Sequence, residues 1–181
     1  MGTYAIFVPG AIQADSADSL VKSARCADSA VERGNVVSLG ALSSTAGEHE
    51  VYIASTPVTG TLTTAIYYMV NEPAVVLVNG KYSGLTDDES DFNIAANKVF
   101  SVFKPKVGDE IILSEDGIGG TKNANTFIIP ANTSLELTWA ASTSGISLVW
   151  ELIETTYVRV PDAKFYNGRK VAYKFRCVVA Q

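Results

Sequence analysis

The chain has 181 residues, of which 47% are hydrophobic and 18% charged, with a formal net charge of −5. This length and composition suffice for one domain with its own core, and the acidic balance without any Lys/Arg cluster argues against nucleic acid as a partner. No stretch approaches the ~18 apolar residues of a membrane helix, and residues 1–10 lack the basic start of a signal peptide. We therefore expect no membrane partner and retention in a cytoplasm.

The first eighteen residues predict an extended N-terminal arm. Pro9-Gly10 interrupts an apolar start, and the polar stretch that follows has neither a strand nor a helix period. An apolar arm in water is unfavourable unless it docks on a partner, so its apolar residues are the candidate partner-binding residues. A chain that begins at Ser19 would then keep its fold and lose partner binding. The candidate residues are Tyr4, Ile6, Phe7 and Val8.

The segment Ser16–Arg33 is compatible with a short helix, because Ala, Leu, Lys, Arg and Glu recur in it. Its apolar residues are mostly small, however, and its Ser and Asp side chains compete for backbone hydrogen bonds. The sequence therefore leaves a helix and an irregular segment as alternatives here.

From Gly34 onward the pattern predicts strands separated by turns. Gly34-Asn35 is a turn signal, and short runs rich in β-branched and aromatic residues follow it. The continuous apolar run at 74–78 is typical of a buried strand. The predicted strands of this region are 36–39, 50–54, 74–78, 99–103, 110–113 and 127–129.

The last third of the chain alternates apolar and polar residues, which is the period of a half-buried strand. The series Leu135–Trp139 and Ile146–Leu152 flank a predicted hairpin turn at Ser142–Gly145. A further strand at 171–179 places Tyr173, Phe175 and Cys177 on one face. Strands at this short spacing, without long helices between them, predict a mainly β fold: one β-sandwich or β-barrel domain over residues 19–181, with the arm at 1–18.

The sequence offers few groups for catalysis or metal binding. The single histidine, His49, lies in a polar stretch, so a solvated imidazole is favoured over a general base. One histidine and two cysteines are too few for a structural zinc site. Cys26 and Cys177 form either a disulfide or, as the low cysteine content favours, two buried thiols. We expect no cofactor, no metal and no enzymatic activity.

Three further motifs favour simple interpretations. The acidic run 87–91 begins no EF-hand loop, because its sixth and twelfth positions are not Gly and Glu, so a solvated loop is expected. Residues 117–122 lack the order of a phosphate-binding loop, and a turn is expected. The carboxylates Glu136, Glu151 and Glu154 act as a catalytic pair only in a convergent geometry and are expected to face water.

Three segments of the N-terminal half share a pattern of turns and strands, and they are Leu20–Ser23, Glu32–Leu42 and Glu48–Ala54. The pattern resembles that of capsid decoration, or auxiliary head, proteins of tailed bacteriophages. In that group a Gly-containing turn precedes a Val-Val-x-Leu-Gly strand, a short polar loop and a Glu-Val-Tyr strand. The region Val99–Leu113 is also similar, and the likeness covers about half of the chain.

The resemblance implies a structural protein on the surface of a virion, assembled in the cytoplasm of the bacterial host. Its implied partners are the major capsid protein and neighbouring copies of itself, a homotrimer included. An extended arm can add a strand to a neighbour's sheet, which agrees with this role. The alternative is a carbohydrate- or cell-surface-binding module of a phage tail or bacterial envelope, with Tyr67, Tyr68 and Tyr157 as the stacking aromatics.

Overall fold

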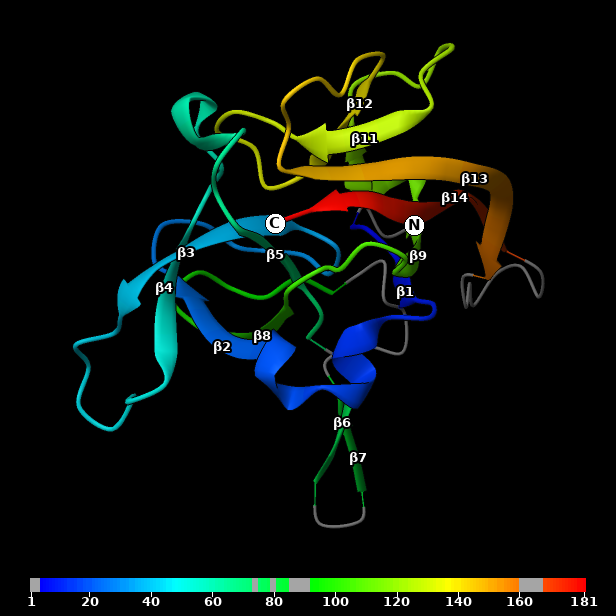
Figure 1. Cartoon of the computed structure of the whole chain (residues 1–181). Helices are drawn as coiled ribbons and strands as arrows, with labels where there is room; N and C mark the ends of the chain where they lie inside the picture. The colour runs from blue at the N-terminus through cyan, green and yellow to red at the C-terminus, as the bar shows by residue number, and fades with distance from the viewer. Residues whose placement is uncertain (1–3, 73–74, 79–80, 85–91, 160–167) are drawn as a thin grey trace.

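The structure is a computed structural model, and it describes residues 4–72, 75–78, 81–84, 92–159 and 168–181. Strands form a closed five-stranded barrel, a seven-stranded sheet and a separate two-stranded hairpin (Figure 1). The predicted mainly β fold of sandwich or barrel type is therefore confirmed. The acidic run at 87–91 lies outside the described residues.

The barrel has the strand order β2-β4-β3-β5-β8 and closes through pairing of β8 with β2. Neighbours β2 and β4 are parallel, whereas the other pairs are antiparallel, and β3 carries an irregularity between Leu39 and Leu42. Its strands are β2 (Val21–Cys26), β3 (Val36–Leu42), β4 (Val51–Ser55), β5 (Tyr67–Val70) and β8 (Val99–Phe103).

The larger sheet has the order β1-β9-β14-β13-β11-β12-β10, with β1 and β10 at its edges. Its longest strands, β13 and β14, pair antiparallel as a ribbon from Leu148↔Ala180 to Arg159↔Arg169. Its strands are β1 (Phe7–Pro9), β9 (Glu110–Ser114), β10 (Ile118–Gly119), β11 (Phe127–Pro130), β12 (Leu137–Ala140), β13 (Leu148–Arg159) and β14 (Arg169–Ala180). Short 3₁₀ turns lie at η1 (Gln13–Ser16), η2 (Asp18–Leu20), η3 (Thr59–Thr61) and η5 (Glu115–Gly117).

Parts of strands β3, β5 and β8 are buried on both faces, because they belong to two cores at once. Successive residues of a strand point to opposite faces. One residue of each adjacent pair packs in the barrel interior, and its neighbour packs in the core between the barrel and the larger sheet. This explains why adjacent residues are both apolar at these points of the strands, instead of alternating with polar ones. The pairs are Val37 and Val36, Val70 and Met69, and Val102 and Phe103, with the barrel residue named first.

The predicted N-terminal arm is not a separate element in the described residues, which begin at residue 4. Phe7 is fully buried, and β1 pairs with β9 as an edge strand of the larger sheet. Gly10 continues this pairing, since its N–H donates to the carbonyl oxygen of Glu110 at 2.9 Å. A Cβ at Gly10 would lie 2.7 Å from that same oxygen, so Pro9-Gly10 ends an edge strand instead of detaching an arm.

Three other segments differ from what the sequence indicated, each for a physical reason. The segment Ser16–Arg33 contains strand β2 rather than a helix, because Ala24 and Cys26 face the barrel interior. The turn at Ser142–Gly145 closes no hairpin, since β11 lies between β12 and β13 and pairs with both. Residues 117–122 form more than a turn: Gly117 is buried, and a Cβ there would lie 2.6 Å from the Cβ of Ala5.

Four aromatic residues of the predicted alternating strands are core residues. Trp139, Trp150, Tyr173 and Phe175 lie in the core between the barrel and the larger sheet, where the indole of Trp139 meets the Tyr173 ring edge-on at 5.2 Å. Both cysteines are buried free thiols, as the low cysteine content favoured.

Candidate protein-binding site

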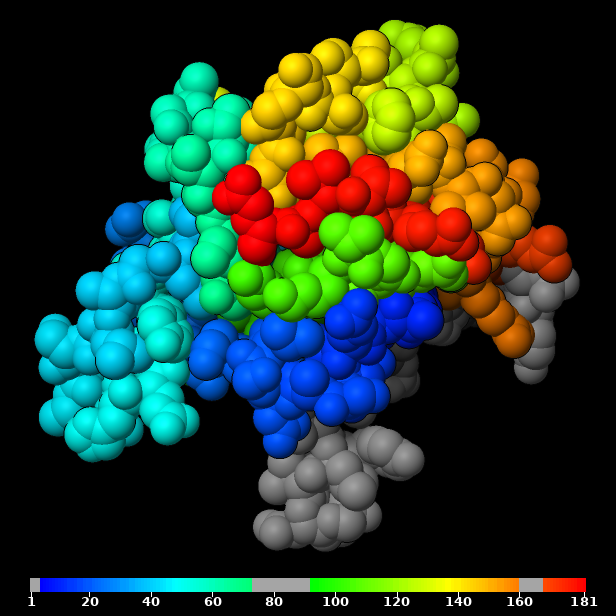
Figure 2. All heavy atoms as spheres, in the orientation of Figure 1, coloured from blue at the N-terminus to red at the C-terminus, as the bar shows by residue number. Residues whose placement is uncertain are grey.

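Two of the four predicted partner-binding residues are occupied within their own fold. Phe7 packs in the main core, and Ile6 packs with Val158 and Ala172 in a small cluster on the opposite face of the sheet. The prediction is therefore wrong for Ile6 and Phe7. Figure 2 agrees, since the N-terminal atoms, drawn in dark blue, lie packed against the body of the molecule. Tyr4 is half-buried and Val8 is exposed, so partner binding through these two stays a prediction.

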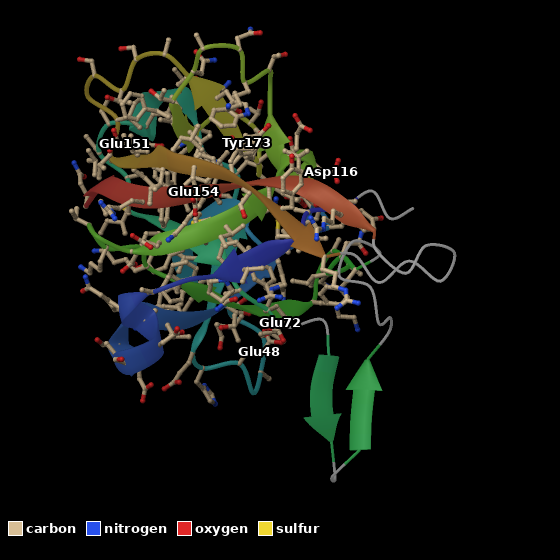
Figure 3. The ribbon with its side chains drawn as sticks, turned by 90° about the vertical axis from the view of Figure 1, so that its right-hand side faces the viewer. Glu48, Glu72, Asp116, Glu151, Glu154 and Tyr173 are labelled. Atoms are coloured by element: carbon tan, nitrogen blue, oxygen red, sulfur yellow. The ribbon has the colours of Figure 1, made fainter. Side chains whose placement is uncertain are left out.

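A different segment projects from the body. Strands β6 (Val75–Val78) and β7 (Lys81–Gly84) form a hairpin that is a sheet by itself, in register from Val75↔Gly84 to Val78↔Lys81. It extends away from both the barrel and the larger sheet (Figures 1 and 3). The sequence predicted the strand at 74–78, but not its isolation from the body. Strand β7 has no such apolar run and was not foreseen.

A second candidate region is the outer end of the barrel next to β2, β3 and β4. A hollow of about 380 Å³ opens there. Acidic, basic and hydroxyl side chains alternate with exposed aliphatic ones around it, so it suits a mixed protein surface better than a purely apolar ligand. The lining residues are Asp18, Val21, Lys22, Ser23, Leu42, His49, Glu50 and Tyr52.

The connection between β3 and β4 is held against the barrel by Arg25 of β2. Its guanidinium forms an ion pair with Glu48 and donates to the hydroxyl of Thr45 at 3.5 Å. The same Glu48 accepts a hydrogen bond from Ser43 Oγ at 3.0 Å. These bonds fix a connection that would otherwise be free to move, and with it they fix the rim of the hollow that carries His49.

The aromatic platform expected at Tyr67 and Tyr68 does not form. Adjacent residues of a strand point to opposite faces, so Tyr67 packs in the core shared with the larger sheet and Tyr68 packs against the barrel core. Burial, together with the nearby Tyr52, raises the pKa of the Tyr68 phenol. Tyr157 alone of the three is well exposed, at 60%.

The groups considered for catalysis lie apart. Glu151 and Glu154 lie on β13 and are exposed (Figure 3), whereas Glu136 is half-buried and immediately precedes β12. His49 is exposed, as predicted. Burial and, secondarily, the charge of Asp109 raise the pKa of the Cys177 thiol to about 12, so this thiol is protonated at neutral pH. The described parts of the chain contain no cluster of three or more His, Cys, Asp or Glu residues able to hold a metal ion.

The partly buried carboxylate of Glu32 lies in surroundings that disfavour its negative charge. The Glu32 carboxylate accepts the backbone N–H of Ala5 at 2.8 Å. Burial raises its pKa, the Ala5 hydrogen bond lowers it less, and the charges of Glu136 and Asp116 raise it further. The ionised form of Glu32 is therefore disfavoured in the folded protein.

We predict that Glu32→Gln stabilises the protein at pH 7. A carboxyl whose folded pKa is raised binds more protons than in the unfolded chain, so its contribution to the free energy of unfolding falls as pH rises above about 4.5. The amide keeps an acceptor for Ala5 without the charge. Urea unfolding at pH 7 and pH 4 checks this: the variant should gain at pH 7, and the gain should shrink at pH 4. An equal difference at both pH values would contradict it.

Comparisons with known protein families, with curated proteins and with solved structures find no match for this chain. In the parts of the chain that the structure describes, no helix is long and apolar enough to cross a membrane.

Proposed function

We propose that the chain is a structural protein that binds the outer surface of a tailed-bacteriophage head and stabilises it. The observation that carries this proposal is the β6–β7 hairpin. A two-stranded hairpin by itself is marginally stable in water, and this one contains four consecutive apolar residues, Val75–Val78. Such a ribbon gains stability when it lies on another protein surface, either as an added strand or as an apolar insert.

The barrel supports the same proposal. The three segments that carry the resemblance to decoration proteins overlap β2, β3 and β4, which are three adjacent strands of the barrel. Residues from all three border the hollow at the end of the barrel. The three segments therefore lie side by side in the barrel, where they supply both core residues and part of one surface.

In this proposal the partners are the major capsid protein and neighbouring copies of the chain, a homotrimer included. The protein acts without catalysis or a cofactor, and it joins the head in the host cytoplasm. In this proposal the hairpin, instead of an N-terminal arm, contacts the partner protein. It projects from the body and can therefore extend to a neighbouring subunit (Figure 1).

The test is binding to phage heads that lack the protein, measured by co-sedimentation. Leu77→Asp places a charge in the apolar run of β6 and should weaken head binding at least tenfold, which is about 1.4 kcal/mol. It should leave the melting temperature of the free protein nearly unchanged, because the hairpin is a sheet separate from the body.

The matched control is Val107→Asp, which adds the same charge at an exposed position between β8 and β9. This variant should bind heads like the wild type. Equal binding by Leu77→Asp and wild-type protein would refute docking through the hairpin. A wild-type protein that does not co-sediment with heads at all would refute the proposed function.

A further inference from the structure

The far end of the β13–β14 ribbon carries a face that the core does not cover. Along the core-facing side, Trp150 pairs with Cys177 and Leu152 with Phe175, and these side chains lie in or against the core. The last two pairs on the same side are Tyr157↔Val171 and Arg159↔Arg169. Val171 is still half-buried against the core, whereas Tyr157 is 60% exposed, the most exposed of the large hydrophobic residues described, and both arginines are exposed.

The two arginines lie directly opposite each other across the ribbon. Like charges in this position repel, so the pair does not serve the stability of the ribbon. The other basic residues of β14 each have an acidic partner: Lys170 pairs with Asp116, and Lys174 and Arg176 pair with Glu110. Within the described ranges, by contrast, neither Arg159 nor Arg169 has an ion pair or a hydrogen bond to another side chain.

These residues surround a hollow of about 450 Å³, which is lined by Thr156, Tyr157, Arg159, Gly168 and Arg169. We propose that this ribbon-end site binds a sugar that carries a carboxylate, such as a uronic or sialic acid. The volume lies in the range of small-ligand sites and suits one to three sugar rings.

The chemistry of the site selects this class of ligand. Two arginines at facing positions of the ribbon suit a carboxylate, because a guanidinium group binds a carboxylate through paired N–H donors. An exposed tyrosine offers a flat apolar face to a pyranose ring and a hydroxyl to its polar edge. A net charge of −5 and a patch of only two or three cations oppose a long polyanion. Lys122, whose ammonium lies 5.3 Å from the Tyr173 ring centre, adds positive charge one pair nearer the core.

The inference is independent of head binding, because the free full-length chain is sufficient to test it. Titrations followed by saturation-transfer and ¹⁵N NMR use glucuronic acid and N-acetylneuraminic acid as probes, glucose as the neutral control and inorganic phosphate as the simple anion. We expect at least one of the two acids to bind with a millimolar or tighter Kd, and glucose at least tenfold more weakly.

The variants locate the site. Arg169→Gln and Tyr157→Ala should each weaken binding of the acidic sugar at least tenfold while the protein stays folded, since both side chains are exposed. Arg176→Gln, on the opposite face of the same strand, should bind like the wild type. The inference is overturned if neither acidic sugar binds better than glucose, or if Arg169→Gln binds unchanged. It is also overturned if phosphate binds as well as the sugars and Tyr157→Ala has no effect, because the site is then a simple anion site.

Discussion

A chain that begins at Ser19 is expected not to fold. The deletion removes β1, which is the edge partner of β9, and buried side chains that include Ile6, Phe7 and Ile12. Each of these three side chains contributes about 1.5–3 kcal/mol through burial, so their combined loss is about 5–9 kcal/mol. That loss is comparable to the whole stability of a domain, about 5–15 kcal/mol. Circular dichroism and a thermal scan should show no cooperative transition.

Point variants in β1 test whether the deletion acts through lost core contacts and not merely through the shorter chain. Phe7→Ala should lower the free energy of unfolding by about 3–5 kcal/mol, because it leaves a cavity next to Phe103, whose ring centre lies 6.3 Å away. Val8→Ala, on the exposed side of the same strand, should change stability far less. A shortened chain that melts cooperatively at the wild-type temperature would instead restore the independent arm.

Trp150→Ala is expected to have the largest effect of any single substitution in the β13–β14 ribbon. Trp150 is the largest of the fully buried side chains in the described residues. It lies opposite Cys177 on β14 and Ile128 on β11. Truncation of a buried aromatic costs about 3–5 kcal/mol, which for a domain of this size lowers the melting temperature by about 6–20 °C. Urea unfolding measures the loss directly.

Trp150→Phe is the matched control. The buried indole N–H of Trp150 has no hydrogen-bond partner among the described residues, so Phe removes an unsatisfied donor while keeping most of the apolar ring. We expect a clearly smaller loss than for Ala. An unchanged melting temperature in Trp150→Ala would contradict the burial of this side chain.

Much of the fold was predictable because the spacing of apolar residues within a strand indicates which of its residues are buried. The apolar runs at 36–39 and 99–103 became β3 and β8, and the alternating series ending in Tyr173, Phe175 and Cys177 became β14. The same spacing does not indicate which strands pair with each other. The interposed β11 and the parallel pairing of β2 with β4 depend on contacts between segments far apart in the chain.

The errors at the N-terminus and at the candidate site have the same origin. Phe7 looks like part of an isolated apolar patch because Leu113, its partner on β9, lies more than a hundred positions away in the chain. The pairing of Arg159 with Arg169 could not be predicted from the sequence either. The sequence of one strand does not show which residue of the neighbouring strand lies opposite, so it does not show that two like charges face each other.

The double burial of β3, β5 and β8 means that the barrel and the larger sheet are not two modules joined side by side. A strand that serves two cores cannot leave one of them intact while it abandons the other. We therefore expect the barrel and the larger sheet to move as one body where these strands run. They should also unfold together, in one transition shared by both sheets rather than one transition for each.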